Sequence, residues 1–304
     1  MKYYLQRICV LIKHREYEKN VLEMKALVEK QGLLVDIRYL GYTYENVQND
    51  DKKVIFLSEY KREKQEKEQT IFVSDDSDTL RKYDEMGYAV LAYFHDDNKE
   101  ENFSGIAYGC ERIEQLDAAY FDRVCRRCKR LPWDILETPR CIIRETTVDD
   151  VDAFYDIYSE PSITEYMEDL FTERQQEIAY IQDYIKNVYE FYDFGVWSVV
   201  LKETGEVIGR AGLSYREGCD IPELGFVIGV PWQRKGIAFE VCDAILHYGM
   251  DMFEFETFQA LVEEGNDTSV RLCQRLGFNM ADDVWIEGKM MHRLLKSLNV
   301  KEID

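Results

Sequence analysis

The amino-acid sequence predicts two α/β domains: a parallel, Rossmann-like layer followed by a mixed α+β sheet. In the first half, apolar β-compatible runs alternate with helical patterns, which is typical of a parallel sheet. In the second half, strands joined through a tight Thr204-Gly205 turn indicate antiparallel pairing. Between the halves, residues 134–141 carry Pro139 and interrupt both patterns. We therefore expect a non-catalytic domain at residues 1–139 and a second domain at residues 140–304.

The N-terminal half alternates short strands with helices. The patterns predict helices at residues 16–31, 74–87 and 113–129, and strands at residues 33–39, 54–57, 70–73, 88–93 and 106–108. The first helix has apolar residues at helical spacing and is followed by Gly32, which favours a helix C-terminus. The strand at residues 88–93 is almost continuously apolar, as strands buried on both faces of a parallel sheet are.

The C-terminal half has a definite succession of elements: strand, two helices, three antiparallel strands, helix, strand, helix and strand. We expect strands at residues 141–144, 195–201, 207–214, 223–230, 257–262 and 284–294, and helices at residues 147–158, 178–188, 236–252 and 266–276. Each helix places its apolar residues on one face, as a helix packed on a sheet does. A loop at residues 160–171 separates the first two helices.

The bulk composition is that of a globular protein with little attraction for polyanions. The 304 residues carry a net charge of −21 at pH 7, with a pI near 4.7. Such a surface disfavours binding to nucleic acid or to anionic lipid. No signal-peptide core follows the basic N-terminus, and no apolar run reaches the roughly 18 residues of a membrane span. We expect a soluble, cytoplasmic protein, for which a homodimer stays open.

The eight cysteines are scattered and resemble no disulfide framework of a small secreted domain. Only Cys125 and Cys128 have the CxxC spacing. A zinc site needs a second ligand pair, and none of the four histidines stands at a suitable spacing. Two thiols on one helical face is the simpler interpretation, so we expect no metal ion.

Two acidic residues, Asp75 and Asp76, stand one serine after the end of the strand at residues 70–73. An acid pair at a strand end suits a metal site, but capping of the next helix is the commoner role. Residues 70–135 weakly resemble the core of a haloacid dehalogenase-like domain. That family needs a DxD nucleophile pair after its first strand, and neither early strand ends in one. The resemblance therefore implies a catalytically inactive relative.

A basic turn joins the strand at residues 223–230 to an amphipathic helix. The helix opens at Gly236 and leaves several backbone N–H groups pointing outward. With the helix dipole, such groups bind phosphate, and a glycine lets the ligand approach the backbone closely. Arg234 and Lys235 add positive charge beside the turn. An ordinary strand–helix connection with a solvated turn would show the same pattern.

Two motifs resemble the GNAT family of N-acetyltransferases, which bind acetyl-CoA. Gln233–Ala238 matches the Q/R-x-x-G-x-G/A signature, and Asn266–Ser269 with Leu276–Phe278 matches the N-x-x-S…LGF segment. With the order of elements, the resemblance covers residues 141–298 and is greatest to the ribosomal-protein and small-amine N-acetyltransferases. It implies the GNAT fold, and acetyl-CoA as cosubstrate without a metal.

The resemblance also implies a set of cofactor contacts. The diphosphate would lie on the backbone of the turn, and the pantetheine would run beside the preceding strand. The implied contacts are Phe226, Val227, Ile228, Gln233, Arg234, Lys235, Gly236, Ile237, Ala238, Asn266 and Ser269. A backbone N–H near Ile228 would stabilise the oxyanion. The side chains of Phe226 and Ile228 are equally expected in the core, and Asn266 as a helix N-cap.

Acyl transfer to an amine needs a base, because only the neutral amine attacks. Glu223 stands near the family's usual carboxylate, and its alternative is a solvated strand-edge residue. Cys273 replaces the family's frequent acid, a tyrosine. A thiol can donate a proton, but burial in the helix is the alternative. For the acceptor, the resemblance implicates Glu165, Tyr166 and Tyr215, whose carboxylate and rings suit a cationic amine and equally suit an acidic surface.

The sequence thus favours an acetyl-CoA-dependent N-acetyltransferase in which a small-molecule or peptide amine attacks directly in a ternary complex. Two alternatives stay open. One is a CoA-binding sensor without turnover, motivated by the missing tyrosine and the inactive first domain. The other is transfer of a different acyl group.

Overall fold

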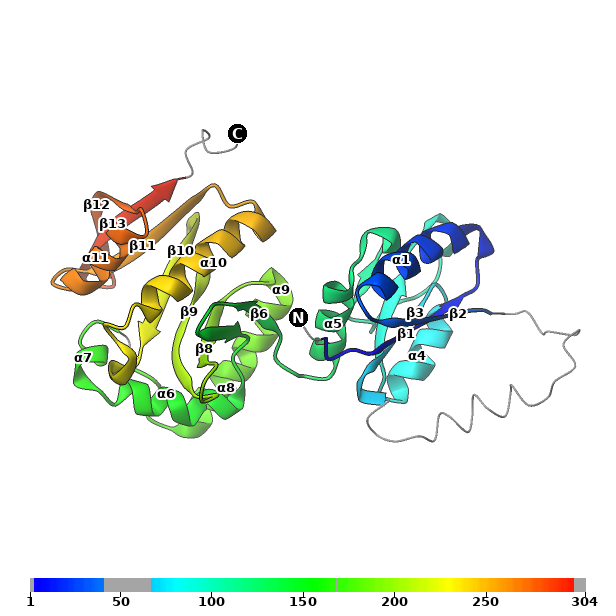
Figure 1. Cartoon of the computed structure of the whole chain (residues 1–304), viewed down its shortest axis with the longest axis horizontal. Coiled ribbons are helices and arrows are strands. Elements are labelled where there is room, and N and C mark those ends of the chain that lie inside the picture. Colours follow the sequence, from blue (N-terminus) through cyan, green and yellow to red (C-terminus); the bar gives the residue numbers. More distant parts are fainter. Residues whose placement is uncertain (1–2, 41–66, 168, 298–304) are drawn as a thin grey trace, which may run out of the picture. The chain divides into compact units, whose positions relative to one another are not determined.

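The computed structural model describes residues 3–40, 67–167 and 169–297. Contacts divide the chain into two compact units, Met1–Trp133 and Asp134–Asp304, each with its own sheet (Figure 1). The division falls at Trp133 and not at Pro139, because the residues that we expected to link the domains form a strand of the second sheet.

The first unit is a parallel sheet with helices on both faces. Its elements are β1 (Arg7–Ile12), α1 (Glu18–Lys30), β2 (Leu34–Tyr39), β3 (Thr70–Ser74), α4 (Ser77–Glu85), β4 (Ala89–Tyr93), β5 (Gly109–Cys110) and α5 (Ala118–Cys128). The strand order is β2-β1-β3-β4-β5. Successive side chains of β1 face opposite sides: Ile8 and Val10 join the core that α1 and α5 cover, whereas Cys9 and Leu11 pack with Leu80 of α4.

Three expectations for this unit change, and one lies outside the described residues. We expected no strand at residues 7–12, yet β1 is an inner strand of the sheet, between β2 and β3. The expected strand at residues 106–108 is replaced by β5 just after it, and the expected helix from residue 113 begins only at Ala118, where Asp117 caps it by accepting the Tyr120 N–H. The strand expected at residues 54–57 is not among the described residues.

The second unit is built on one mixed sheet. Its elements are β6 (Asp134–Glu137), β7 (Cys141–Arg144), α6 (Val151–Tyr158), α7 (Pro161–Thr164), α8 (Arg174–Tyr184), the π-helix η5 (Ile185–Tyr189), α9 (Glu190–Tyr192), β8 (Val196–Leu201), β9 (Val207–Arg216), β10 (Cys219–Ile228), α10 (Ile237–Phe253), β11 (Thr257–Glu263), α11 (Asp267–Arg275), β12 (Asn279–Ile286) and β13 (Lys289–Ser297). The strand order is β12-β13-β11-β10-β9-β8-β7-β6, and only β10 and β11 pair in parallel.

Helices cover both faces of this sheet. The helices α6 and α8 form one core with Val227 of β10. On the other face α10 lies close to the strands, because Gly249 has no side chain to separate it from Leu213 and Phe258. The expected strand at residues 284–294 is a hairpin of two strands, turned by Glu287 and Gly288 at positive φ. No helix in the described parts of the chain is long and apolar enough to cross a bilayer.

Candidate functional site

The second sheet opens between its two parallel strands. β10 keeps its register with β9 from Glu223 to Ile228, but it pairs with β11 at one position, where Glu223 lies opposite Gln259. Over the same stretch β11 stays paired with β13 as far as Glu263. The C-terminal half of β10 therefore presents a backbone edge that β11 does not occupy, and an extended ligand can pair with such an edge.

The register decides which backbone groups line this edge. The N–H of Gly229 donates to the carbonyl oxygen of Ile208 in β9 at 2.8 Å. Hydrogen-bonding direction alternates along a strand, so the N–H groups of Phe226 and Ile228 point away from β9, toward the opening. The side chains of Val227 and Ile228 are buried and that of Phe226 partly so. The two roles expected for this stretch, packing and backbone binding, are therefore compatible.

The turn after β10 has a conformation that suits an anion. Gly236 has a φ of +78°, and the 17-residue helix α10 starts directly after it. A left-handed residue beside right-handed ones makes successive N–H groups converge, and no side chain caps this helix start. Arg234 and Lys235 are exposed, and no carboxylate within the described ranges forms an ion pair with either. The turn thus combines exposed amides with two available cations.

Arg140, which the sequence did not single out, holds this turn in place. Its Nη1 donates to the carbonyl oxygen of Lys235 at 2.8 Å, and its Nε donates to Oε2 of Glu240 in α10 at 2.7 Å. Burial raises the pKa of Glu240, but hydrogen bonds from Thr138 and Arg140 outweigh this and lower the pKa overall. Gln233 closes the other side of the turn, because its Nε2 donates to the carbonyl oxygen of Ile228 at 2.8 Å.

Glu223 lies inside β10 and not at its start, as we had expected. Alternation along β10 puts its side chain on the same face as Val227, the face that α6 and α8 cover. Its Oε2 accepts from Nε of Arg216 at 3.0 Å, and its side chain is 15% exposed. The carboxylate is therefore oriented by a cation and is still reachable.

Cys273 is fully buried in α11, and burial raises the pKa of its thiol to about 11. A thiol without exposed surface is poorly placed to protonate a leaving group, so the structure favours the packing alternative. Asn266 acts as the expected N-cap, because its Oδ1 accepts from the backbone N–H of Ser269 at 3.1 Å. Asn266 therefore caps the start of α11, and Cys273 packs near its end.

The residues expected to bind the acceptor do not gather in one place. Tyr166 donates its hydroxyl to the carbonyl oxygen of Gly265 at 3.3 Å, so it and its neighbour Glu165 lie beside the turn after β11. That turn is about 20 Å along the strand from the level of Glu223, at 3.3 Å per residue. Tyr215 packs on Phe194 and Phe255 on the α10 face, opposite Glu223. A role of these three residues in binding the acceptor stays a prediction.

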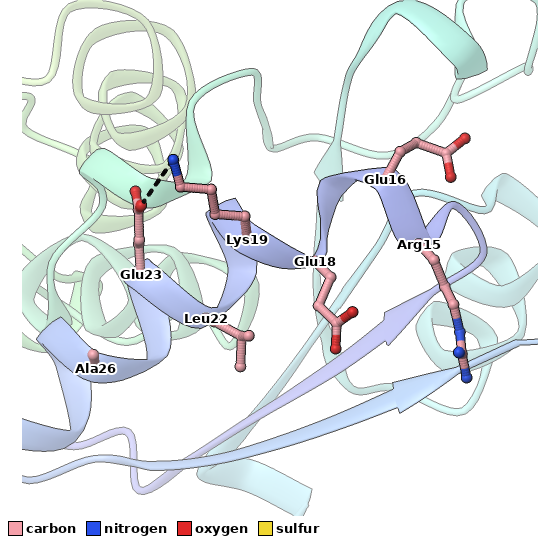
Figure 2. Close-up of a pocket in the computed structure, with 7 residues that line it drawn as sticks. All are labelled: Arg15, Glu16, Glu18, Lys19, Leu22, Glu23 and Ala26. Atoms are coloured by element: carbon pink, nitrogen blue, oxygen red, sulfur yellow. Dashed lines mark ion pairs between the residues drawn. The ribbon is translucent and has the colours of Figure 1, made fainter.

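The first unit has a hollow of its own. A cavity of about 530 Å³ lies along α1 (Figure 2). It is lined by Arg15, Glu16, Glu18, Lys19, Leu22, Glu23 and Ala26. Lys19 and Glu23, four residues apart on α1, form an ion pair at 3.7 Å. None of the residues implied for the cofactor lines this hollow.

Comparison with known proteins shows which protein family the second unit is similar to. Residues 140–279 match the family model described as acetyltransferase (GNAT) domain. The chain is similar to p20 of Bacillus licheniformis, named an uncharacterized N-acetyltransferase, with 29% identity over 150 residues, 48% of this chain and 82% of p20. YoaA of Bacillus subtilis, with the same description, is 29% identical over 150 residues, 47% of this chain and 82% of YoaA.

Among solved structures, the chain is similar to RimL, a ribosomal-protein alpha-N-acetyltransferase in its apo form. The TM-score is 0.48 at 12% identity, covering 55% of this chain and 96% of RimL. These similarities concern about half of the chain. The resemblance of residues 70–135 to haloacid dehalogenase-like domains stays a prediction.

Proposed function

Because residues 140–279 form a GNAT acetyltransferase domain, we propose that this protein transfers an acetyl group from acetyl-CoA to a primary amine by direct attack in a ternary complex. The observation that carries the proposal is the junction of β10 and α10. There a strand edge left free by β11 runs directly into an uncapped helix start with a left-handed glycine.

Cofactor binding follows from that junction. The diphosphate lies on the N–H groups that follow Gly236, where convergent amides and the helix dipole favour negative charge. The side chains of Arg234 and Lys235 neutralise the remaining charge. The pantetheine extends back along β10 as an added strand, bonded to the backbone of Phe226 and Ile228. Arg140 and Glu240 keep the turn in its binding conformation without contacting the acyl group.

The chemistry needs an oxyanion donor and a base. The N–H of Ile228 faces the opening, so it can donate to the thioester oxygen as negative charge develops there. Glu223 takes one proton from the ammonium form of the acceptor, directly or through one water, which gives the neutral amine. The amine nitrogen then bonds to the carbonyl carbon and the C–S bond breaks. The proton that the nitrogen loses as the amide forms passes through water to the departing thiolate of coenzyme A. Cys273 has no role in this scheme.

The acceptor amine approaches the thioester from the face of the sheet on which the side chains of Glu223 and Gln259 lie. Arg216 and Gln259 flank the base on that face. Glu165 and Tyr166 are proposed to contact a longer acceptor, such as a peptide, at the far end of the opening. Tyr215 lies on the other face of the sheet, so it is proposed to pack against its aromatic neighbours and not to contact the acceptor.

The test combines binding with turnover. Calorimetry should detect coenzyme A binding to the intact chain, and acetyl-CoA should release thiol with at least one member of a panel of small amines and peptide N-termini. Gly236→Asp should abolish binding, because it adds a side chain at φ +78° and a negative charge beside the phosphates. Gly205→Asp is the matched control, since Gly205 has a φ of +74° in the β8–β9 turn with open space around it.

The outcomes separate the alternatives. Absence of binding to either form of coenzyme A overturns the proposal. Tight binding without turnover on any amine supports the sensor instead. Turnover only with a longer acyl thioester supports transfer of a different acyl group.

A further inference from the structure

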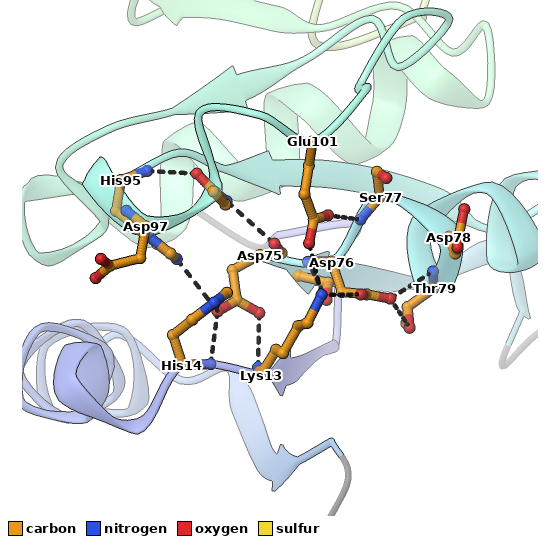
Figure 3. Close-up of polar contacts among 12 residues, drawn as sticks. Lys13, His14, Asp75, Asp76, Ser77, Asp78, Thr79, His95, Asp97 and Glu101 are labelled. Carbon is orange, nitrogen blue, oxygen red and sulfur yellow. Dashed lines mark hydrogen bonds and ion pairs between the residues drawn. The ribbon is translucent and has the colours of Figure 1, made fainter.

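Three side chains from three neighbouring strands meet at the carboxyl edge of the first sheet (Figure 3). His14 follows β1, Asp75 follows β3 and His95 follows β4. One nitrogen of each imidazole and one carboxylate oxygen lie within 4.8 Å of one another. In the strand order β2-β1-β3-β4-β5, β2 lies on one side of β1 and the later strands lie on the other, so the order switches between β1 and β3. Open α/β sheets bind ligands outside the carboxyl ends of their strands at such a point.

The carboxylate of Asp75 is the centre of this cluster and is completely buried. Its Oδ2 lies 2.9 Å from Nδ1 of His14 and 3.2 Å from Nε2 of His95. Its Oδ1 accepts the backbone N–H of Lys13 at 2.7 Å. The N-cap role proposed for this pair of acids falls to Asp76 alone, which accepts from the N–H of Thr79. Asp75 does not cap this helix; its Oδ2 also accepts the backbone N–H of His14 at 2.9 Å, so it orders the segment that carries His14.

Both imidazoles are held in position before any ligand arrives. The ring of His95 stacks on Tyr17 with centroids 3.8 Å apart and meets the edge of Tyr93 at 5.4 Å, and its side chain is only 3% exposed. The side chain of His14 is 21% exposed, so the cluster reaches solvent on that side. A rigid donor set with one open side suits a small ligand that enters from solvent.

Charge around the cluster also favours a cation. The nearest ammonium, that of Lys13, pairs with Glu101 at 2.7 Å and with Asp76 at 3.1 Å. The buried carboxylate of Asp75 lies between the two imidazoles. A buried charge of this kind is favourable when it is paired or coordinates a metal.

We propose that His14, Asp75 and His95 bind a divalent transition-metal ion such as Zn²⁺. Two imidazole nitrogens and one carboxylate oxygen are donors that Zn²⁺ and its first-row neighbours take, whereas Mg²⁺ and Ca²⁺ prefer oxygen alone. Three protein ligands leave a coordination position open for water or an anion. This site replaces our expectation that the protein holds no metal.

Metal binding changes the hydrogen bonds of the cluster in a defined way. Nδ1 of His14 and Nε2 of His95 become metal ligands, so they no longer form hydrogen bonds with Oδ2 of Asp75. The ring proton of His95 then sits on Nδ1, in place of the 3.3 Å hydrogen bond that Nδ1 accepts from the Asp97 N–H. The hydrogen bond from Lys13 to Oδ1 is unaffected, and it orients the carboxylate as outer-shell partners do in metal sites.

The experiment titrates Zn²⁺, and Co²⁺ as a spectroscopic probe, into the full chain after chelation and under reducing conditions. We expect one ion per chain and a Co²⁺ spectrum without thiolate-to-metal charge transfer. His14→Ala should weaken binding by more than the roughly 10–100-fold that loss of an outer-shell partner causes. The matched control is the double variant His247→Ala/His292→Ala, which removes the other two histidines and should bind like the parent.

The result can overturn the proposal cleanly. Because His14 is partly exposed, its alanine variant should fold, and circular dichroism verifies this before the titration. If the folded variant binds Zn²⁺ as tightly as the parent, if the parent binds none, or if a thiolate band shows ligation by Cys125 and Cys128, the proposal fails. Acetyl-CoA takes no part in this test, so its result is independent of the acetyltransferase proposal.

Discussion

Single residues in the second unit differ in what their surroundings allow. Glu223 is oriented by Arg216 and keeps some contact with solvent, so it can exchange a proton with an incoming amine. Cys273 has the side chain of a proton donor but none of the access. The same family resemblance suggested a catalytic role for both residues. Only their different burial shows which of the two an amine can reach. At the residue scale, solvent access therefore decides which of the two can act chemically.

Replacing Glu223, the proposed base, tests this distinction. Glu223→Gln keeps the shape of the side chain and its place in β10 but cannot accept the amine proton. We expect kcat/KM to fall by about 10²–10⁴-fold, the usual contribution of a positioned acid or base. The affinity for coenzyme A, measured by calorimetry, should stay the same. Glu203→Gln, in the exposed β8–β9 turn, is the control; a Glu223→Gln enzyme as active as this control would exclude Glu223 as the base.

The strand, turn and helix of β10 and α10 act as one element. Gly236 supplies the conformation, and the hydrogen bonds from Arg140 to Lys235 and Glu240 prevent the turn from relaxing. An exposed ion pair of this kind adds little to global stability, typically below about 1 kcal/mol. Its value here is in fixing the amides before the ligand binds, which reduces the ordering entropy lost on binding.

Removing that support should affect binding more than folding. For Arg140→Ala we expect the Kd for coenzyme A to rise about 10-fold, which is about 1.4 kcal/mol, with a nearly unchanged Tm. Lys202→Ala is a matched control, because Lys202, directly after β8, forms a partly exposed ion pair with Glu137 of β6 at 2.8 Å. Calorimetry and a thermal melt on both variants check this. Equal affinities for the two variants would contradict a role of Arg140 in the turn.

Across the whole molecule, buried thiols link stability to alkaline pH. Burial raises the pKa of Cys9, Cys110 and Cys125 to about 12 and that of Cys273 to about 11, from an ordinary value of 9.0. Unfolding restores ordinary values, so above about pH 9 the unfolded chain loses protons that the folded chain keeps. Stability that depends on these thiols is therefore complete below pH 9 and falls as pH rises toward 11–12.

Denaturant unfolding under reducing conditions, measured from pH 8 to pH 11, checks this. Each thiol contributes a slope of up to about 1.4 kcal/mol per pH unit in that window. Cys273→Ala removes one of these groups, so its unfolding free energy should decline less steeply than that of the parent. Identical slopes would mean that the Cys273 thiol is not protected in the folded chain.

Much of the second unit could be predicted from the sequence, because its signals are local. Helical spacing, the Thr204-Gly205 turn and the Gln233–Ala238 motif each lie within one short stretch. In the first unit, β1 could not be predicted from the sequence, because a strand buried on both faces resembles any short apolar run. The single strand expected at residues 284–294 failed for a related reason: two residues at positive φ, one of them not a glycine, make the hairpin turn.

The sequence by itself determined most of the order of elements in the second unit and the motif at the turn between β10 and α10, because neighbouring residues encode both. Only the tertiary structure decided which side chains meet. Arg140 and Glu240 are 100 residues apart, and His14 is brought to Asp75 and His95 by three parallel strands that end at one edge. The tertiary structure also shows that Tyr215 and Glu223 lie on opposite faces of the second sheet. Contacts of this kind depend on strand order and register, which local patterns do not specify.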